Sequence, residues 1–317
     1  MAGDTRREAD MSAPSFVASV QLRFSLVRRE SDVRLESRSG AGVHAVRTPD
    51  GPDAYLKVTP AALGGHALEA ARRELRFYTT VAPTAPVRTP TLLDHLDTDD
   101  GVALLLEAAG EPAPVGRWAP EMWSALGCDL AALHAMAPPA QPGWHGPDPL
   151  RQALADPDLA ATRTFWAPTL PHLDELLSRL AELEADMTAV PPAFVHGDCH
   201  TDNIVHRAGA LVFCDWQSAG TGRPLSDLAF LSVRATPAGV TVPAAVLDAY
   251  LAGGGHERRT VERALLAEEL AIFLLQWPPF AAYNSPAAVE RVRRRTRMLA
   301  DRWLNMPAPS TDAPRLR

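Results

Sequence analysis

The chain has 317 residues, of which 46% are hydrophobic, and its formal net charge is −7 at pH 7. This length and apolar content suit two packed lobes and exclude a disordered chain. The acidic balance argues against general nucleic-acid binding. It would suit a cationic substrate, although the same charge would also simply keep a protein in solution.

Cysteine usage and segment hydrophobicity bear on the compartment. Cys128, Cys199 and Cys214 follow no metal-type spacing, which is typical of reduced thiols in the cytoplasm. The first twelve residues are polar and charged rather than a secretion signal. No apolar run has the length of a membrane span. We therefore expect a cytoplasmic protein, monomer or dimer, that binds neither membranes nor nucleic acid.

The first third of the chain is typical of a small antiparallel sheet with one inserted helix. A flexible arm is expected at residues 1–12 and a short helix at 16–26. Apolar residues at three- and four-residue spacing predict a longer helix at 61–81. Alternating segments bounded by turn residues predict five strands, at residues 33–39, 43–48, 54–59, 91–96 and 102–106.

The remainder is mostly helical. Two short strands are predicted at residues 203–206 and 211–214, and a Pro- and Gly-rich loop at 138–149. Helices are predicted at 120–136, 170–187, 225–234, 244–251, 261–276 and 287–303. The expected division is a flexible arm at 1–12, an N-terminal lobe at 13–108, a C-terminal lobe at 109–306 and a disordered tail at 307–317.

The most informative stretch begins at His196. Asp198 is followed five residues later by Asn203, and Asp215 comes directly after the next predicted strand. This order is that of kinase-type phosphoryl transfer, where one carboxylate orients and deprotonates a hydroxyl group. An amide oxygen and a second carboxylate then hold Mg²⁺, which prefers hard oxygen ligands. We predict Asp198 as the catalytic residue, and Asn203 and Asp215 as metal ligands.

A lone lysine supports this interpretation. Of 31 basic residues only Lys57 is lysine, and it lies in an alternating apolar segment that predicts a strand. Lysine and arginine are not interchangeable where a compact charge must reach ATP phosphates from a strand. The alternative is a surface lysine without function.

Together these residues resemble the aminoglycoside phosphotransferase family of small-molecule kinases, over about residues 30–300. The residues that carry the resemblance are His196-Gly197-Asp198, Asn203, Asp215-Trp216, Pro224, Asp227 and the helical segment from Arg73 to Tyr78. The resemblance implies a bilobal, protein-kinase-like α+β fold. Its small lobe would be a five-stranded antiparallel sheet with one main helix, and its larger lobe mostly helical.

The resemblance also implies a nucleotide site for ATP, with GTP left open, and Mg²⁺. The implied nucleotide contacts are Lys57, its helix partner Glu74, the glycine-loop residues Gly40 and Gly42, and the backbone of Glu107 and Ala109. This loop has fewer glycine residues than a full kinase glycine motif. A second departure from the family is Cys199, which replaces the usual leucine after Asp198.

Alternatives stay open at several positions. Glu69 competes with Glu74 for Lys57, but the two lie five positions apart and so point to different helix faces. Asp227, at a predicted helix start, is expected to brace the catalytic loop rather than to react. His196 is expected to bond the backbone, and Cys199 to be a small apolar loop residue.

The acceptor is predicted to be a small molecule bound by the helical lobe. Residues expected near it are Asp202, Glu268, Glu269, Trp277 and Tyr283. For the two glutamates the alternative is a solvated helix face, and for the aromatic residues it is core packing. The expected function is ATP-dependent transfer of a phosphoryl group to a hydroxyl group, with an antibiotic as the first choice of acceptor. A metabolic amino alcohol or sugar is the alternative, and a nucleotide-binding module without transfer activity is the rival from another class.

Overall fold

The computed structural model describes residues 16, 19–20, 22–28, 42–47, 51, 53–139 and 142–307. The expected arm, the expected strand at 33–39, Gly40 and nearly all of the expected tail lie outside these residues. The chain divides into two compact units, each built from two stretches of sequence. We call Met1–Pro112 with Asn203–Ala219 the sheet unit, and Ala113–Asp202 with Gly220–Arg317 the helical unit.

The sheet unit is built on a five-stranded antiparallel sheet of order β1-β2-β3-β5-β4. Its strands are β1 (Val27–Arg28), β2 (Gly42–Arg47), β3 (Asp53–Pro60), β4 (Leu92–Thr98) and β5 (Gly101–Glu107). Strands β2, β3, β4 and β5 agree with predicted strands. Strand β1 was not predicted, since the first predicted strand was placed at residues 33–39. A second, three-stranded sheet contains β6 (Glu111–Pro112), β8 (Ile204–Arg207) and β9 (Ala210–Phe213).

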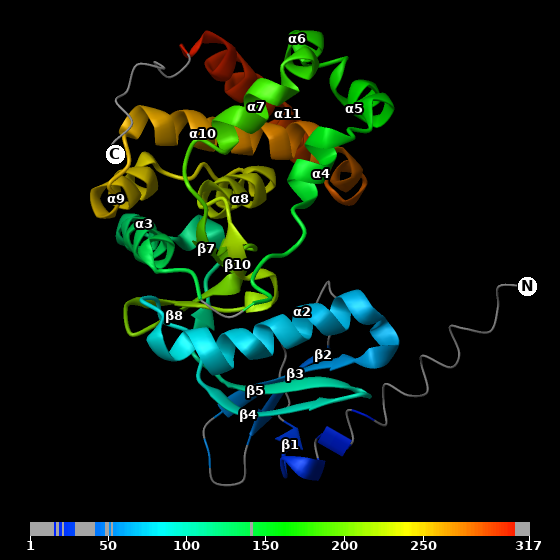
Figure 1. Ribbon diagram of the computed structural model, residues 1–317, viewed down its shortest axis with the longest axis vertical. Coiled ribbons are helices and arrows are strands. Elements are labelled where there is room, and N and C mark those ends of the chain that lie inside the picture. The colour runs from blue at the N-terminus through cyan, green and yellow to red at the C-terminus, as the bar shows by residue number, and fades with distance from the viewer. Residues whose placement is uncertain are drawn as a thin grey trace, which may run out of the picture. The chain divides into compact units, whose positions relative to one another are not determined.

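The two faces of the five-stranded sheet have different partners because successive strand side chains alternate. Leu56 and Val58 of β3 pack against apolar residues of the N-terminal helical segment, among them Phe16 and Val20. The opposite face is covered by α2 (Gly65–Arg76), which lies across the sheet in Figure 1. A π-helical turn, Phe77–Val81, continues α2.

The helical unit contains nine α-helices in the described part of the chain. They are α3 (Pro120–Ala135), α4 (Pro149–Ala155), α5 (Leu159–Trp166), α6 (Leu173–Ser178), α7 (Leu180–Met187), α8 (Leu225–Ala235), α9 (Ala244–Gly253), α10 (Arg258–Ala271) and α11 (Pro286–Asn305). Two short strands, β7 (Ala193–Val195) and β10 (Gly220–Gly222), pair antiparallel. A core of aliphatic and tryptophan side chains joins these helices and includes Trp166 and Trp303, both fully buried.

One predicted helix is wrong. The segment 170–187 is two helices, α6 and α7, because the backbone leaves helical geometry at Arg179 (φ −113°, ψ 22°). At this break the Arg179 guanidinium lies over the ring of Trp303, 4.6 Å from its centroid. A partner so distant in sequence leaves no mark on local periodicity. Among the described residues, no helix is both long and apolar enough for a membrane crossing.

Helices α4 and α5 were not predicted, although the sequence carries a signal for both. Each begins with an aspartate whose carboxylate accepts a hydrogen bond from a backbone N–H three residues later. Asp148 accepts from Arg151 at 3.0 Å, and Asp158 accepts from Ala161 at 2.9 Å. This is ordinary N-capping, and it satisfies a donor that the helix itself cannot.

Candidate active site

Lys57 is the centre of the candidate nucleotide site. It lies on β3 and is 7% exposed, and its Nζ is 2.6 Å from Glu74 Oε2 and 2.6 Å from Asp215 Oδ1. Glu74 comes from α2 and is almost fully buried, whereas the Asp215 side chain is 31% exposed. Glu69 is exposed and lies near Arg76 instead. The helix partner of Lys57 is therefore Glu74, as the sequence predicted.

Electrostatics explain why this lysine stays charged. Burial alone would lower the pKa of Lys57, but Glu74 and Asp215 outweigh burial and raise it above its ordinary value. Burial raises the pKa of Glu74, and Lys57 opposes that rise. Two carboxylates thus compensate one cation, and the ammonium group has three donors, one more than these two contacts require.

Asp215 occupies a special backbone position. Its φ and ψ are 63° and 64°, the left-handed region that non-glycine residues seldom adopt. Such backbone strain collects at functional sites, where the surroundings enforce it. Here the next residue, Trp216, is fully buried and stacks on Phe77 of the π-helical turn, with centroids 3.9 Å apart. That stack ties the segment carrying Asp215 to the helix carrying Glu74.

Asn203 is placed close to Asp215 by strand pairing. It directly precedes β8, and its carbonyl accepts a hydrogen bond of 2.8 Å from the N–H of Cys214, which follows β9. The sheet unit thus supplies an amide oxygen and a part-exposed carboxylate. These two hard oxygen donors fit Mg²⁺, which takes few protein ligands and completes its octahedron with water and phosphate oxygens. Among the described residues no cluster of three or more His, Cys, Asp or Glu residues offers a metal site.

Asp198 lies in the helical unit, on the loop that follows β7. The loop is held by Asp227 of α8, whose carboxylate accepts hydrogen bonds from the N–H groups of His196 at 2.8 Å and Gly197 at 2.9 Å. The N–H of Asp198 donates to His196 Nδ1 at 3.3 Å. Both expectations are confirmed: Asp227 braces the loop, and the His196 ring bonds its backbone.

Asp227 is itself held by side chains that the sequence analysis did not identify. His134 of α3 places its Nε2 3.1 Å from Asp227 Oδ2 and its Nδ1 3.1 Å from the hydroxyl oxygen of Tyr250 on α9. Burial would raise the pKa of Asp227, but His134 and the backbone N–H donors lower it. Asp227 is therefore an ionised, fully buried anchor that several donors satisfy.

His200 lies between two carboxylates of the same loop. Its Nε2 is 3.7 Å from Asp198 Oδ1 and its Nδ1 is 3.6 Å from Asp202 Oδ2. Asp202 is largely exposed and 3.3 Å from Arg234. Its side chain thus reaches solvent but already has a basic neighbour. Cys199 is buried, and burial raises its pKa well above the ordinary value, so it is an unreactive apolar residue.

The predicted adenine contacts lie at the end of β5. The N–H of Glu107 donates to the Thr91 carbonyl at 2.9 Å, so only the Glu107 carbonyl remains to meet a base. Its side chain bonds Thr91 and Arg207, and Arg207 lowers its pKa. Ala109 is buried next to this strand end. Gly42 begins β2, and Gly40 lies outside the described residues.

The acidic pair on α10 has an unexpected environment. Glu268 is fully buried and bonds Arg223 at 2.7 and 2.8 Å, and Glu269 is 4% exposed and bonds Arg295 at 2.8 and 2.9 Å. The solvated-face alternative is therefore wrong. The proposed acceptor contact also loses its basis, because a cationic acceptor would have to displace an arginine from each carboxylate.

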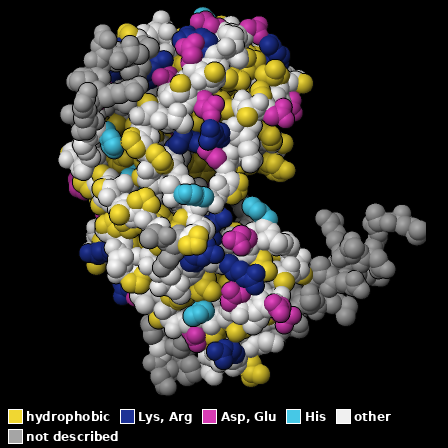
Figure 2. All heavy atoms as spheres, in the orientation of Figure 1, with side chains coloured by type: hydrophobic (Ala, Val, Ile, Leu, Met, Phe, Trp, Pro, Cys, Tyr) yellow, Lys and Arg dark blue, Asp and Glu magenta, His cyan; other side chains and the backbone are white. Residues whose placement is uncertain are grey.

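The aromatic candidates separate into core and surface. Trp277 is 5% exposed and belongs to the core of the helical unit, so core packing is the correct alternative for it. Tyr283, by contrast, is 86% exposed. Charge is also mixed at the surface, since Figure 2 shows acidic and basic side chains interspersed on the face in view.

An antiparallel sheet with a buried Lys–Glu pair, a helical unit and two aspartate-bearing loops defines a kinase-like fold. The family model of the phosphotransferase enzyme family matches residues 36–266. The chain belongs to this family, and the resemblance to aminoglycoside phosphotransferases is confirmed. The family also agrees with the predicted enzyme class, a phosphotransferase acting on a hydroxyl group. No curated protein is significantly similar in sequence.

Solved structures share the fold at low identity. Amicoumacin kinase hAmiN, in complex with AMP-PNP and Ca²⁺, has a TM-score of 0.62 and 12% identity, covering 92% of this chain and 96% of that chain. A choline/ethanolamine kinase family protein from Mesorhizobium loti gives 0.57 and 19%, covering 90% and 95%. Aminoglycoside phosphotransferase APH(3'')-Id from Streptomyces rimosus gives 0.53 and 22%, covering 81% and 97%. The predicted fold class is confirmed.

Proposed function

We propose that the chain moves the γ-phosphoryl group of ATP, or alternatively of GTP, to a hydroxyl group of a small molecule. The observation that carries this is the Lys57–Glu74–Asp215 cluster, in which a buried lysine is held between two carboxylates at 2.6 Å. A purely structural Lys–Glu ion pair would not need a second, part-exposed carboxylate in left-handed backbone geometry.

Each residue has a role that follows from its chemistry. Lys57 binds phosphate oxygens of the nucleotide, and Glu74 keeps its ammonium group in place. Asp198 accepts the proton of the acceptor hydroxyl and orients its oxygen for attack on the γ-phosphorus. The bond to the β-phosphate oxygen then breaks, and the nucleoside diphosphate leaves with that electron pair. Asp227 acts through the loop, because its bonds to His196 and Gly197 set the direction of Asp198.

Asn203 and Asp215 would hold Mg²⁺. Bound there, the ion would neutralise phosphate charge. The protein itself contributes positioning and exclusion of competing geometries, which account for most of the rate enhancement in this class of reaction.

The acceptor is proposed as an antibiotic or, alternatively, a metabolic amino alcohol or sugar. Structural neighbours include the amicoumacin kinase and an aminoglycoside phosphotransferase, but also an aminopropanol kinase and an ethanolamine kinase. The arginine bonds of Glu268 and Glu269 weaken the case for a polycation. Asp202 is the remaining exposed acid, and Tyr283 the most exposed aromatic candidate. We keep the cytoplasm as the proposed compartment.

The decisive experiment measures nucleoside diphosphate release with ATP and Mg²⁺ against an acceptor panel. The panel should contain aminoglycosides, macrolides, cationic peptides, amino alcohols and sugars, and mass analysis should look for the gain of one phosphoryl group. Asp198→Asn is the matched control, since it keeps side-chain volume and removes the base. A nucleotide-binding module without transfer activity would bind ATP yet give no adduct with any acceptor, and that result would reject the proposal.

A further inference from the structure

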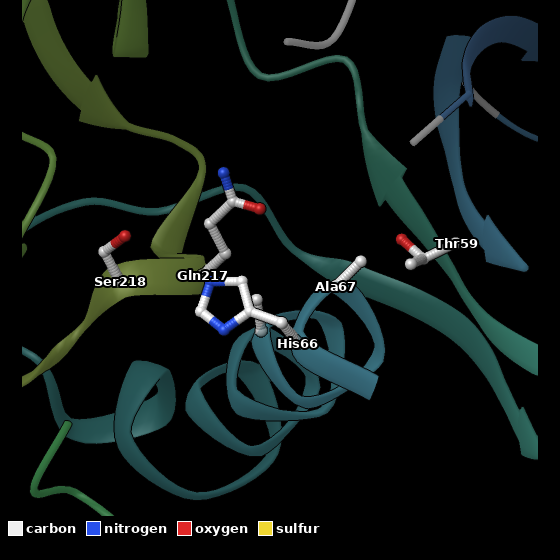
Figure 3. A pocket seen from close by; sticks show the side chains of 6 residues that line it. Thr59, His66, Ala67, Gln217 and Ser218 are labelled. Atoms are coloured by element: carbon white, nitrogen blue, oxygen red, sulfur yellow. The ribbon is translucent and has the colours of Figure 1, made fainter. Parts of the chain in front are cut away.

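A cavity of about 250 Å³ lies in the sheet unit on the same sheet face as Lys57. It is lined by Thr59, His66, Ala67, Ala70, Gln217 and Ser218. In Figure 3, His66 and Ala67 stand at the beginning of α2, Thr59 on the strand beside it, and Gln217 and Ser218 on the segment across from it. None of the roles assigned so far uses these residues.

Thr59 contributes a hydroxyl group to the lining of this cavity. The residue is 3% exposed and lines the cavity, and its hydroxyl group makes no hydrogen bond within the part of the chain that the structure describes. Polar groups on almost buried residues normally have a hydrogen-bond partner, so this hydroxyl group is available to a ligand or an ordered water in the cavity. In Figure 3 the hydroxyl oxygen is turned toward Ala67 and the cavity.

The lining favours an anion over a cation. Thr59, Ser218, Gln217 and His66 can all donate hydrogen bonds, and no carboxylate is among the described residues that line the cavity. Ala67 and Ala70 leave room on the helix side. The cavity therefore offers several donors around a space larger than one oxyanion.

The beginning of α2 decides the class of ligand. This helix has no side-chain cap and no acidic residue in its first turn, so its first N–H groups and their partial positive charge are not neutralised by the helix itself. The space beside the start is open, since a Cβ placed on Gly65 would meet nothing within 4 Å. Uncapped helix starts bind phosphate-type anions.

We propose that this cavity is a second anion site, for inorganic phosphate or the phosphoryl group of a phosphorylated small molecule, separate from the nucleotide site. His66 precedes Glu74 by eight positions, or about 12 Å along the helix. An occupant would contact both α2, which carries Glu74, and the segment after Asp215. It would thus connect the two elements that supply the carboxylates of Lys57.

The test uses the full-length protein and measures binding of inorganic phosphate and, separately, of glycerol 3-phosphate by calorimetry. Gly65→Asp places a negative charge beside the site while favouring the helix itself. Gly65→Asn is its uncharged control. We expect Gly65→Asp to bind phosphate about tenfold more weakly than Gly65→Asn, and Thr59→Val to lose a similar factor. Melting temperatures without phosphate verify folding of all three variants.

Saturation with a non-hydrolysable ATP analogue and Mg²⁺ separates this site from the nucleotide site. Phosphate affinity that persists under saturation and falls only in Gly65→Asp and Thr59→Val supports the proposal. Tighter binding of glycerol 3-phosphate than of phosphate identifies a phosphorylated molecule as the ligand, and the reverse order identifies free phosphate. Full displacement by the nucleotide, equal affinity in the two Gly65 variants, or no measurable phosphate binding overturns it.

Discussion

At the scale of single residues, Lys57 explains why an arginine-rich chain keeps one lysine. Its Nζ must approach Glu74 and Asp215 to 2.6 Å each inside a nearly closed space. An ammonium group is compact and directs its three donors tetrahedrally, whereas a guanidinium group is planar and larger. The position therefore selects shape as well as charge.

Lys57→Arg should consequently impair the enzyme although charge is conserved. We expect turnover to fall by roughly two orders of magnitude because misplacement of about 1 Å costs that much. Steady-state kinetics and nucleotide affinity of the variant provide the measurement. Wild-type values for both would show that the lone lysine has no part in the reaction.

Asp198→Asn tests the proposed base with almost no change of volume. Turnover should fall by roughly 10²–10⁴-fold, the usual contribution of general base catalysis. Nucleotide affinity should stay at the wild-type value, because Lys57 and Asp215 belong to the sheet unit and are unaltered. Single-turnover transfer and equilibrium nucleotide binding are the two measurements, and a variant that turns over normally would refute the role.

The ionised Asp227 carboxylate should make the free energy of unfolding depend on pH in the acid range. Its pKa is lowered from 3.8 in the folded protein, so its ionised form stabilises the fold fully above that value, and the contribution disappears as pH falls through the lowered pKa. Asp227→Asn should therefore reduce the free energy of unfolding by about 3 kcal/mol near pH 7. The gap to wild type should narrow below about pH 4. Urea titrations across this range provide the measurement, and a constant gap would contradict the pKa direction.

At the scale of elements, buried ion pairs connect helices that are distant in sequence. Arg223, directly before α8, bonds Glu268 of α10 and Asp148 at the start of α4. The first turn of α8 carries Asp227, so this arginine holds the helix that braces the loop bearing Asp198. The acidic pair on α10 thus stabilises the packing of the helices. Its charge suggested an acceptor contact because the sequence alone does not show that each glutamate bonds an arginine.

A double-mutant cycle measures this connection. Glu268→Leu alone should cost about 3–5 kcal/mol, since Arg223 would be left with less compensation in a buried site. Adding Arg223→Met should recover part of that loss, because no unpaired cation remains. Thermal unfolding of the four proteins is the measurement. Strictly additive effects would show that the two side chains do not interact energetically.

Elements with strong local patterns could be predicted, and those set by distant contacts could not. The alternation around Lys57 gave β3, and the apolar spacing after residue 61 gave α2. At the helix break Arg179 contacts Trp303, and the buried Glu269 bonds Arg295, and both of these partners are distant in sequence. The same distinction applies to the site, where the spacing from Asp198 to Asn203 is local but the contact of His134 with Asp227 is not.

At the scale of the whole molecule, nucleotide binding should stabilise the sheet unit in particular. A ligand at one hundred times its dissociation constant adds about 2.7 kcal/mol to the state that binds it. In scanning calorimetry, an ATP analogue should therefore raise the unfolding temperature of the sheet unit, and Mg²⁺ should raise this temperature further. Asp215→Asn should remove the Mg²⁺-dependent increment. An increment of wild-type size in this variant would count against Asp215 as a metal ligand.

The two-part composition of the sheet unit has a consequence for synthesis. Its first part ends at Pro112, and the second, Asn203–Ala219, leaves the ribosome roughly a hundred residues later. At about 5–20 residues per second this is a delay on the order of ten seconds. During that interval Lys57 and Glu74 exist without Asp215, and Phe77 without the Trp216 ring on which it stacks. The nascent sheet unit therefore exposes the apolar ring of Phe77 until Trp216 has been synthesised, and this surface is where we expect a chaperone to bind during translation.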